Sequence, residues 1–195
     1  MASLEPVDET MDQPIDDVEW WRRRYSDTQP VGWALRHSFP DRWFRIHSLP
    51  EARRYPNDDS DWETLLDRHR AVSNEVIPTG SPCYLITPWS CAKDGCFAEY
   101  PLRLIEALPV FRPQEDEPPT GGYFGARIEW DFDRFEPVLR AAARWESLSC
   151  IVSEDRLCAY APYDGGADLF LPDTSTRDAL KERFAEYLSE REDGL

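Results

Sequence analysis

The sequence predicts a single α+β domain in which a mainly antiparallel sheet carries helices on one face or at its ends. A chain of 195 residues is long enough for one domain with a substantial core. Several short segments have the two-residue period of strands, and tight turns between such segments pair strands antiparallel. Other segments have helical spacing, and their apolar faces need a sheet to pack against.

The N-terminal segment is expected to lie outside this domain. Residues 1–19 contain seven acidic residues and no Lys or Arg. We therefore expect a disordered acidic arm over residues 1–15 and a single domain over residues 16–195. The domain is predicted to begin with a helix, because Val18, Trp21 and Tyr25 have helical spacing.

The next two segments, VGWALRH and RWFRIHSL, are predicted to form a β-hairpin around a turn at residues 39–41. In the second segment Trp43, Arg45 and His47 alternate with Phe44 and its neighbours, which is the period of a strand. Leu49-Pro50 ends that strand, because proline cannot donate a hydrogen bond to the ladder.

The middle of the chain contains the clearest helix, residues 60–76. Ser60 and Glu63 match a capping box, and an apolar stripe that includes His69 follows them. Residues 83–87 are a predicted strand, and the polar sequence at residues 113–122 predicts a loop rich in proline and acid.

The last third has the most regular pattern. The segment GARIEW predicts a strand, and a helix over residues 135–145 should hold Pro137 in its first turn. LSCIVS and RLCAYAP predict a second hairpin, and ADLFL predicts a short strand. A final helix should begin at Asp173 or Thr174 and bury Leu180 and the apolar residues that follow it.

Composition excludes several classes of function. With 38 acidic and 22 basic residues the net charge is −16, which disfavours contact with a nucleic-acid backbone. The sequence has no apolar run long enough to cross a membrane and no secretory signal, so we expect a cytoplasmic protein without membrane contact. The five cysteines are most simply reduced core residues.

No complete catalytic, metal or cofactor motif is present, and none of these is predicted. His69 lies on an apolar stripe and is expected to be a hydrogen-bonded core residue. A metal held by His37 and His47 with a carboxylate or Cys91 matches no standard spacing. Cys91 and Cys96 form one closely spaced pair, but a zinc knuckle needs a second such pair, which the sequence lacks.

Two segments contain the candidate binding residues. RWFRIHSLPEARRYP and PYDGGADLF supply the following candidates: Arg45, His47, Glu51, Arg53, Arg54, Tyr55, Asp164 and Asp168. The arginines suit either the binding of an anion or internal ion pairs. The two aspartates could hold a divalent ion or share a proton, or cap a turn and start a strand. We expect the segments to be neighbours, with Arg53 paired to Asp164 and Arg45 to Asp168.

The same two segments resemble a group of small bacterial proteins of unknown function. The likeness lies in R-I-H-S-L-P-E followed by a basic pair and Tyr, and in P-Y-D-G-G-A-D before a last helix. It implies a bacterial origin and a shared fold, and it implies no reaction. In its acidic, single-domain character the chain is also similar to immunity proteins that neutralise toxins.

Two hypotheses of function follow from these observations. The first is a non-enzymatic bacterial interaction protein, of immunity type, whose acidic surface binds a protein partner. The alternative is an enzyme or binder of a small anionic ligand, in which the arginines clamp the anion and His47 acts as acid or base.

Overall fold

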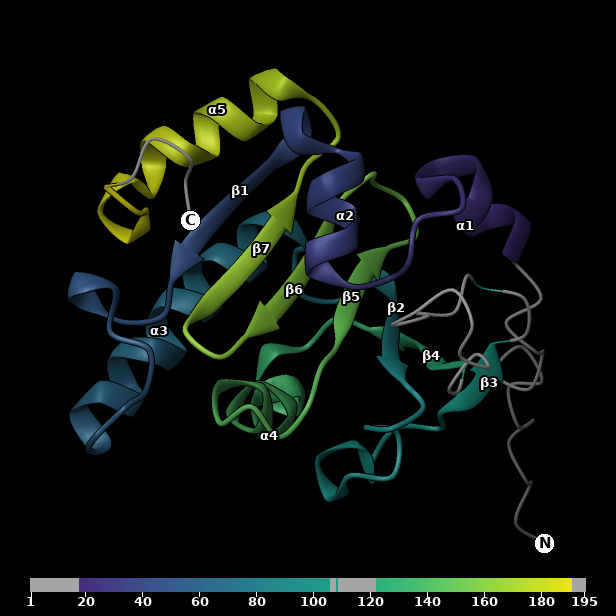
Figure 1. Ribbon diagram of the computed structural model, residues 1–195, viewed down its shortest axis with the longest axis horizontal. Coiled ribbons are helices and arrows are strands. Elements are labelled where there is room, and N and C mark those ends of the chain that lie inside the picture. The colour runs from purple at the N-terminus through teal and green to yellow at the C-terminus, as the bar shows by residue number, and fades with distance from the viewer. Residues whose placement is uncertain (1–17, 106–107, 109–121, 191–195) are drawn as a thin grey trace, which may run out of the picture.

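The computed structural model describes residues 18–105, 108 and 122–190. The expected acidic arm and the predicted loop up to residue 121 lie outside these residues. The described chain forms one sheet of seven strands in the order β1-β7-β6-β5-β2-β4-β3 (Figure 1). All neighbouring strands are antiparallel, which confirms the predicted α+β fold.

Strands and helices alternate loosely along the chain. The strands are β1 Trp43–His47, β2 Pro82–Pro88, β3 Arg103–Ile105, β4 Tyr123–Glu129, β5 Cys150–Ser153, β6 Ala159–Tyr163 and β7 Gly166–Phe170. The α-helices are α1 Val18–Tyr25, α2 Gly32–Ser38, α3 Asp59–Val76, α4 Phe132–Ala143 and α5 Thr174–Arg183.

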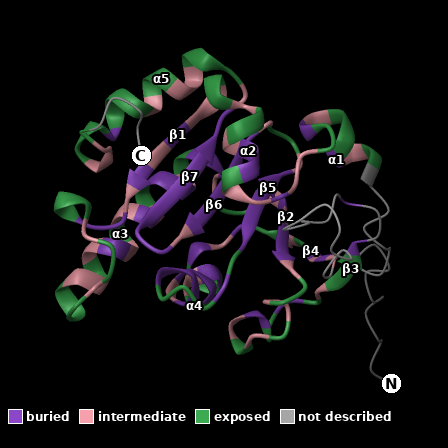
Figure 2. Ribbon diagram, viewed as in Figure 1, coloured by how far each residue is buried: buried purple, intermediate pink, exposed green. Residues whose placement is uncertain are grey.

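Helices cover both faces of the sheet, and not only one face or its ends as expected. In Figure 1, α2 lies in front of the sheet and α3 behind it. Alternate strand residues divide between two apolar clusters: Phe44 and Leu169 pack with α3, α4 and the end of α5, whereas Ala161 and Phe170 pack with α1 and α2. Figure 2 shows the central strands almost wholly buried and the exposed residues concentrated on the helices.

The hairpin predicted from VGWALRH and RWFRIHSL is wrong. Residues 32–38 form the helix α2, and β1 pairs instead with β7, from Trp43 opposite Phe170 to His47 opposite Gly166. The apolar spacing of the first segment fits a helix as well as a strand, because Ala34 and Leu35 are both buried on one helix face.

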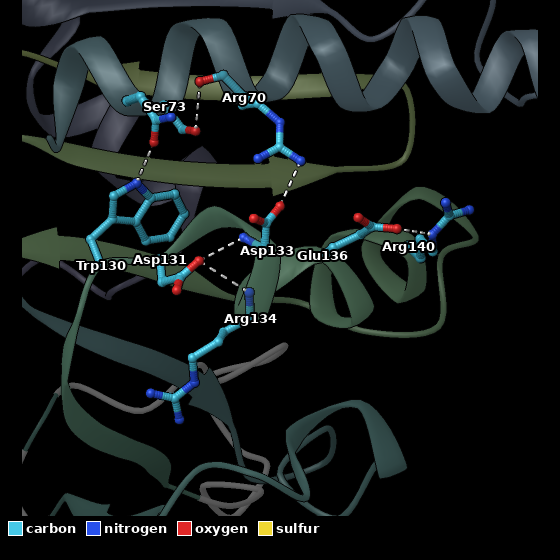
Figure 3. Close-up of polar contacts among 9 residues, drawn as sticks. Arg70, Ser73, Trp130, Asp131, Asp133, Arg134, Glu136 and Arg140 are labelled. Atoms are coloured by element: carbon cyan, nitrogen blue, oxygen red, sulfur yellow. Dashed lines mark hydrogen bonds and ion pairs between the residues drawn. The ribbon is translucent and has the colours of Figure 1, made fainter. Parts of the chain in front are cut away.

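Two helix starts also differ from prediction. Asp58 caps α3 by accepting from the Asp61 N–H at 2.9 Å, so the Ser60 capping box is wrong. Asp131 caps α4 in the same way, at 2.9 Å from the Asp133 nitrogen (Figure 3). This upstream cap starts α4 earlier than predicted, and Pro137 therefore lies inside the helix rather than in its first turn.

Polar contacts join α3 to the start of α4 (Figure 3). The Trp130 indole N–H donates to Asn74 Oδ1 at 2.9 Å, and Arg70 pairs with Asp133 at 2.7 Å. Two further predictions for the C-terminal third are confirmed: β5 and β6 form a hairpin, and Asp173 caps α5. The buried stripe expected on the last helix is wrong for α5 itself, which has no fully buried residue: Leu180 is partly buried, and the buried Phe184 follows the end of the helix.

None of the described helices combines the length and the apolar character that a membrane span requires.

Candidate functional site

A pocket of about 490 Å³ opens at one end of the interior strands, where β2 and β6 end and β5 and β7 begin. Its wall is formed by the N-terminal half of α2, the β6–β7 turn and the residues that precede β5. Four of the predicted candidates line it: Arg45, Arg54, Asp164 and Asp168.

Two glycines build the β6–β7 turn that brings the candidate segments together. Gly165 has φ +114°, which favours glycine, and a Cβ on Gly166 would lie 2.1 Å from the Ile46 carbonyl oxygen. The Gly165 carbonyl accepts from the Ser48 N–H at 2.9 Å. The expectation that the two segments are neighbours in space is thus confirmed by backbone contacts as well as by side chains.

Arg45 and Asp168 form the predicted ion pair, at 3.0 Å between Nε and Oδ1, and both side chains are largely buried. The Trp43 indole N–H donates to the same oxygen at 2.9 Å. The guanidinium of Arg45 also lies 4.7 Å from the centre of the Tyr163 ring. Burial raises the pKa of Tyr163 to about 12, so its hydroxyl stays protonated at neutral pH.

Asp164 pairs with Arg54, at 2.8 Å between Nε and Oδ2, and accepts from the Tyr55 hydroxyl at 2.9 Å on the same oxygen. The hydrogen bond to Asp164 raises the pKa of Tyr55. The expected pairing of Arg53 with Asp164 is wrong, because Arg53 binds both oxygens of Asp61 at 2.6 and 2.7 Å. These bonds lower the pKa of Asp61 to about 2.

The backbone conformation before the two arginines explains why Arg54, and not Arg53, pairs with Asp164. Glu51 and Ala52 both have left-handed φ angles, 58° and 53°, between β1 and the arginines. The two consecutive arginines then serve different elements, Arg53 the start of α3 and Arg54 the β6–β7 turn. A sequence pattern does not reveal a left-handed turn at non-glycine residues.

The pocket wall holds polar groups whose bonding is incomplete. Asp164 Oδ1 and Ser149 Oγ are buried and have no hydrogen-bond partner in the described chain. Arg36, on α2, makes no ion pair with any described residue, and its guanidinium lies 5.4 Å from the centre of the Trp43 ring.

The rest of the wall is apolar and partly exposed. Trp33, Trp145 and Leu148 line the pocket and are 50, 66 and 37% exposed. They are three of the six large apolar side chains exposed in the described part of the chain. Trp145 also has a left-handed backbone, with φ 62°.

The close fit of α2 onto the sheet depends on Gly32. A Cβ at that position would lie 2.8 Å from Asp168 Oδ2 and 3.3 Å from the Ala161 Cβ. The side chains of Trp33 and Arg36 therefore reach the pocket from a helix that sits directly on β6 and β7.

The remaining four candidates do not line the pocket: His47, Glu51, Arg53 and Tyr55. His47 Nε2 is buried and has no hydrogen-bond partner among the described residues, and burial lowers the pKa of His47. His69 is the hydrogen-bonded core residue predicted, with Ser48 Oγ at 2.8 Å and the Tyr160 hydroxyl at 2.7 Å. Burial lowers the pKa of His69 to about 3.

Sequence reasoning missed Trp33, Arg36 and Trp145. The first two were hidden by the assignment of α2 as a strand, although Gly32 and Arg36 have the i, i+4 spacing of one helix face. Trp145 follows the end of α4 with no distinguishing pattern. Within the residues that the structure describes, no three His, Cys, Asp or Glu side chains are grouped so that they could hold a metal ion.

Residues 31–192 match a family described as Domain of unknown function (DUF3885). The chain belongs to this family. No curated protein and no solved structure matches the chain. The matched region runs from the residue before α2 to beyond α5, so it contains every residue of the pocket wall except Pro30.

Proposed function

We propose that this DUF3885 protein binds a small organic anion with an apolar or aromatic body in the pocket between α2 and the β6–β7 turn. The observation that carries the proposal is Arg36, a guanidinium in the pocket wall that has no carboxylate partner among the described residues. A binding function is proposed, and no reaction is assigned.

The charges of the wall favour an anion. Asp164 and Asp168 are matched by Arg54 and Arg45, which leaves Arg36 as the surplus charge. A guanidinium presents a planar fork of donors that fits a carboxylate or phosphate. A local positive excess is notable in a chain whose net charge is −16.

The apolar part of the wall supports an organic ligand over an inorganic ion. Ligand pockets have volumes of about 300–1,000 Å³ and combine apolar walls with a few polar groups. Trp33 and Trp145 leave much of their aromatic surface open to water beside this pocket. An apolar ligand body that covers these rings removes their exposed surface from water, which makes a favourable hydrophobic contribution to binding.

The proposal is tested by ligand-observed saturation-transfer NMR with 3-phenylpropionate and 3-phenylpropanol, which share a body and differ in charge. We expect 3-phenylpropionate to bind and the neutral alcohol to bind at least about tenfold more weakly, since a charged hydrogen-bonded pair contributes about 1.5–3 kcal/mol. Arg36→Gln should remove this preference. Arg23→Gln, on the exposed side of α1, is the matched control and should change nothing.

Equal binding of the acid and the alcohol, or no binding of either, would count against an anion site. Loss of binding in both arginine variants would point to a general charge effect and would contradict the role given to Arg36.

A second candidate is the non-enzymatic interaction protein, of immunity type, that binds a basic protein partner. Its support is the charge count: even if every one of the 22 basic residues were paired, 16 of the 38 acidic residues would remain unmatched. A pull-down at low and high salt should then recover a stoichiometric partner only at low salt. Recovery of the protein alone at both salt concentrations would contradict this candidate.

A further inference from the structure

We infer that the ligand of this pocket carries an amine as well as its anionic group, and is therefore a zwitterion of amino-acid type with an apolar or aromatic side chain. This inference rests on the proposed function and names the class of ligand. Its basis is the uneven bonding of Asp164 together with the position of Ser149 in the same wall.

The two oxygens of Asp164 have different surroundings. Oδ2 receives both protein donors, Arg54 Nε at 2.8 Å and the Tyr55 hydroxyl at 2.9 Å. Oδ1 receives no donor from the part of the chain that the structure describes, although only 2% of the side chain is exposed. The chain thus holds the carboxylate in place through one oxygen and leaves the other as an acceptor.

A buried acceptor without a donor is unfavourable, by about 1–3 kcal/mol and more when the group is charged. An incoming donor removes this penalty. An ammonium group suits the place well, because it offers three N–H donors and a positive charge to a carboxylate oxygen. Ser149 Oγ is also buried and has no hydrogen-bond partner among residues 18–105, 108 and 122–190, so it can accept a second N–H of the same group.

A ligand that carries only an anionic group does not provide hydrogen bonds to all the polar groups of the pocket wall. A purely anionic ligand at Arg36 offers no N–H donor, so it leaves Asp164 Oδ1 and Ser149 Oγ without a hydrogen bond from the described residues or from the ligand. A ligand with both charges places its anion at Arg36 and its ammonium at Asp164. The aromatic rings of Trp33 and Trp145 then cover its apolar side chain.

Three probes with one phenyl ring test the inference on the full chain by isothermal titration calorimetry: L-phenylalanine, 3-phenylpropionate, which lacks the amine, and phenethylamine, which lacks the carboxylate. We expect phenylalanine to bind at least about tenfold more tightly than either. Asp164→Asn should weaken phenylalanine to the level of 3-phenylpropionate and leave 3-phenylpropionate within about twofold of its wild-type affinity.

Two further variants keep the test decisive. Ser149→Ala should weaken phenylalanine by a smaller factor and spare 3-phenylpropionate, even if Asp164→Asn fails to fold. Asp133→Asn, at an exposed carboxylate on α4, is the matched control and should leave all three affinities unchanged.

The outcomes separate this inference from the function on which it rests. If 3-phenylpropionate binds as tightly as phenylalanine, the amine subsite is refuted and the anion site stands. If none of the three probes binds, the proposed function itself is refuted. If phenethylamine binds as tightly as phenylalanine, the pocket recognises amines alone and the zwitterion is refuted.

Discussion

His69 and Asp164 are both buried polar residues, but they differ in how completely their side chains are hydrogen-bonded. His69 on α3 has a hydrogen bond at each ring nitrogen, to Ser48 and to Tyr160, and is completely buried in the core beneath β6. Asp164, in the turn that follows β6, has two bonds to described residues on one oxygen and none on the other.

This difference in hydrogen bonding indicates which of the two residues has a structural role. A buried polar group with every partner in place fixes the packing of its neighbours and has no capacity left for a ligand. A buried group with one position open retains that capacity at a cost in stability. Proteins tolerate such a cost mainly at functional sites. The complete hydrogen bonding of His69 therefore indicates a structural role, and the incomplete bonding of Asp164 indicates a role in ligand binding.

The largest expected effect is the difference in stability between His69→Ala and Asp164→Asn. His69→Ala leaves a cavity and two buried hydroxyls without partners, which should lower the free energy of unfolding by about 3–5 kcal/mol. Asp164→Asn keeps the shape and weakens a pair whose arginine is 60% exposed, so it should cost about 1 kcal/mol or less. Urea denaturation at pH 7 measures both.

For ligand binding we expect the opposite result: Asp164→Asn should have the larger effect and His69→Ala the smaller one. Below its melting temperature His69→Ala should bind the pocket ligand normally, whereas Asp164→Asn should not. A large loss of stability in Asp164→Asn would show that Asp164 is as structural as His69, and the comparison would fail.

The fold was largely predictable from the sequence because its strands and longer helices carry periodic apolar patterns. The β5–β6 hairpin and helix α3 follow from such patterns, because each pattern there fits only one type of secondary structure. The segment over Gly32–Ser38 is too short to distinguish the two periods, and the prediction of a strand there was wrong. Packing on the sheet through Gly32, a long-range effect, decides its conformation.

The candidate site was predictable only in part. Arg45, Arg54, Asp164 and Asp168 were all found, because they cluster in two short segments with turn-forming residues. Which arginine pairs with which aspartate depends on left-handed residues before Arg53 that the sequence does not reveal. Residues contributed by α2 depend on how the sheet is assembled, which no local pattern encodes.

A smaller effect, in the pH dependence of stability, sharpens the same comparison. Burial lowers the pKa of His69 to about 3 in the folded protein, against an ordinary value of 6.5. Below pH 6.5 the unfolded chain takes up a proton at this residue that the folded protein does not, so its contribution to stability is present above pH 6.5 and is lost as the pH falls toward 3.

The expected slope is at most about 1.4 kcal/mol per pH unit for one residue. The lowered pKa of His47, caused by burial and by the charges of Arg45 and Arg68, adds to the loss with the same sign. Urea denaturation between pH 7 and 5.5 measures the effect before most carboxylates titrate. Relative to the wild type, His69→Ala should flatten the slope, and His37→Ala, at an exposed position on α2, should not. If His69→Ala keeps the full slope, the folded protein must accept a proton at His69, and the fully bonded, neutral histidine on which the comparison depends would not exist.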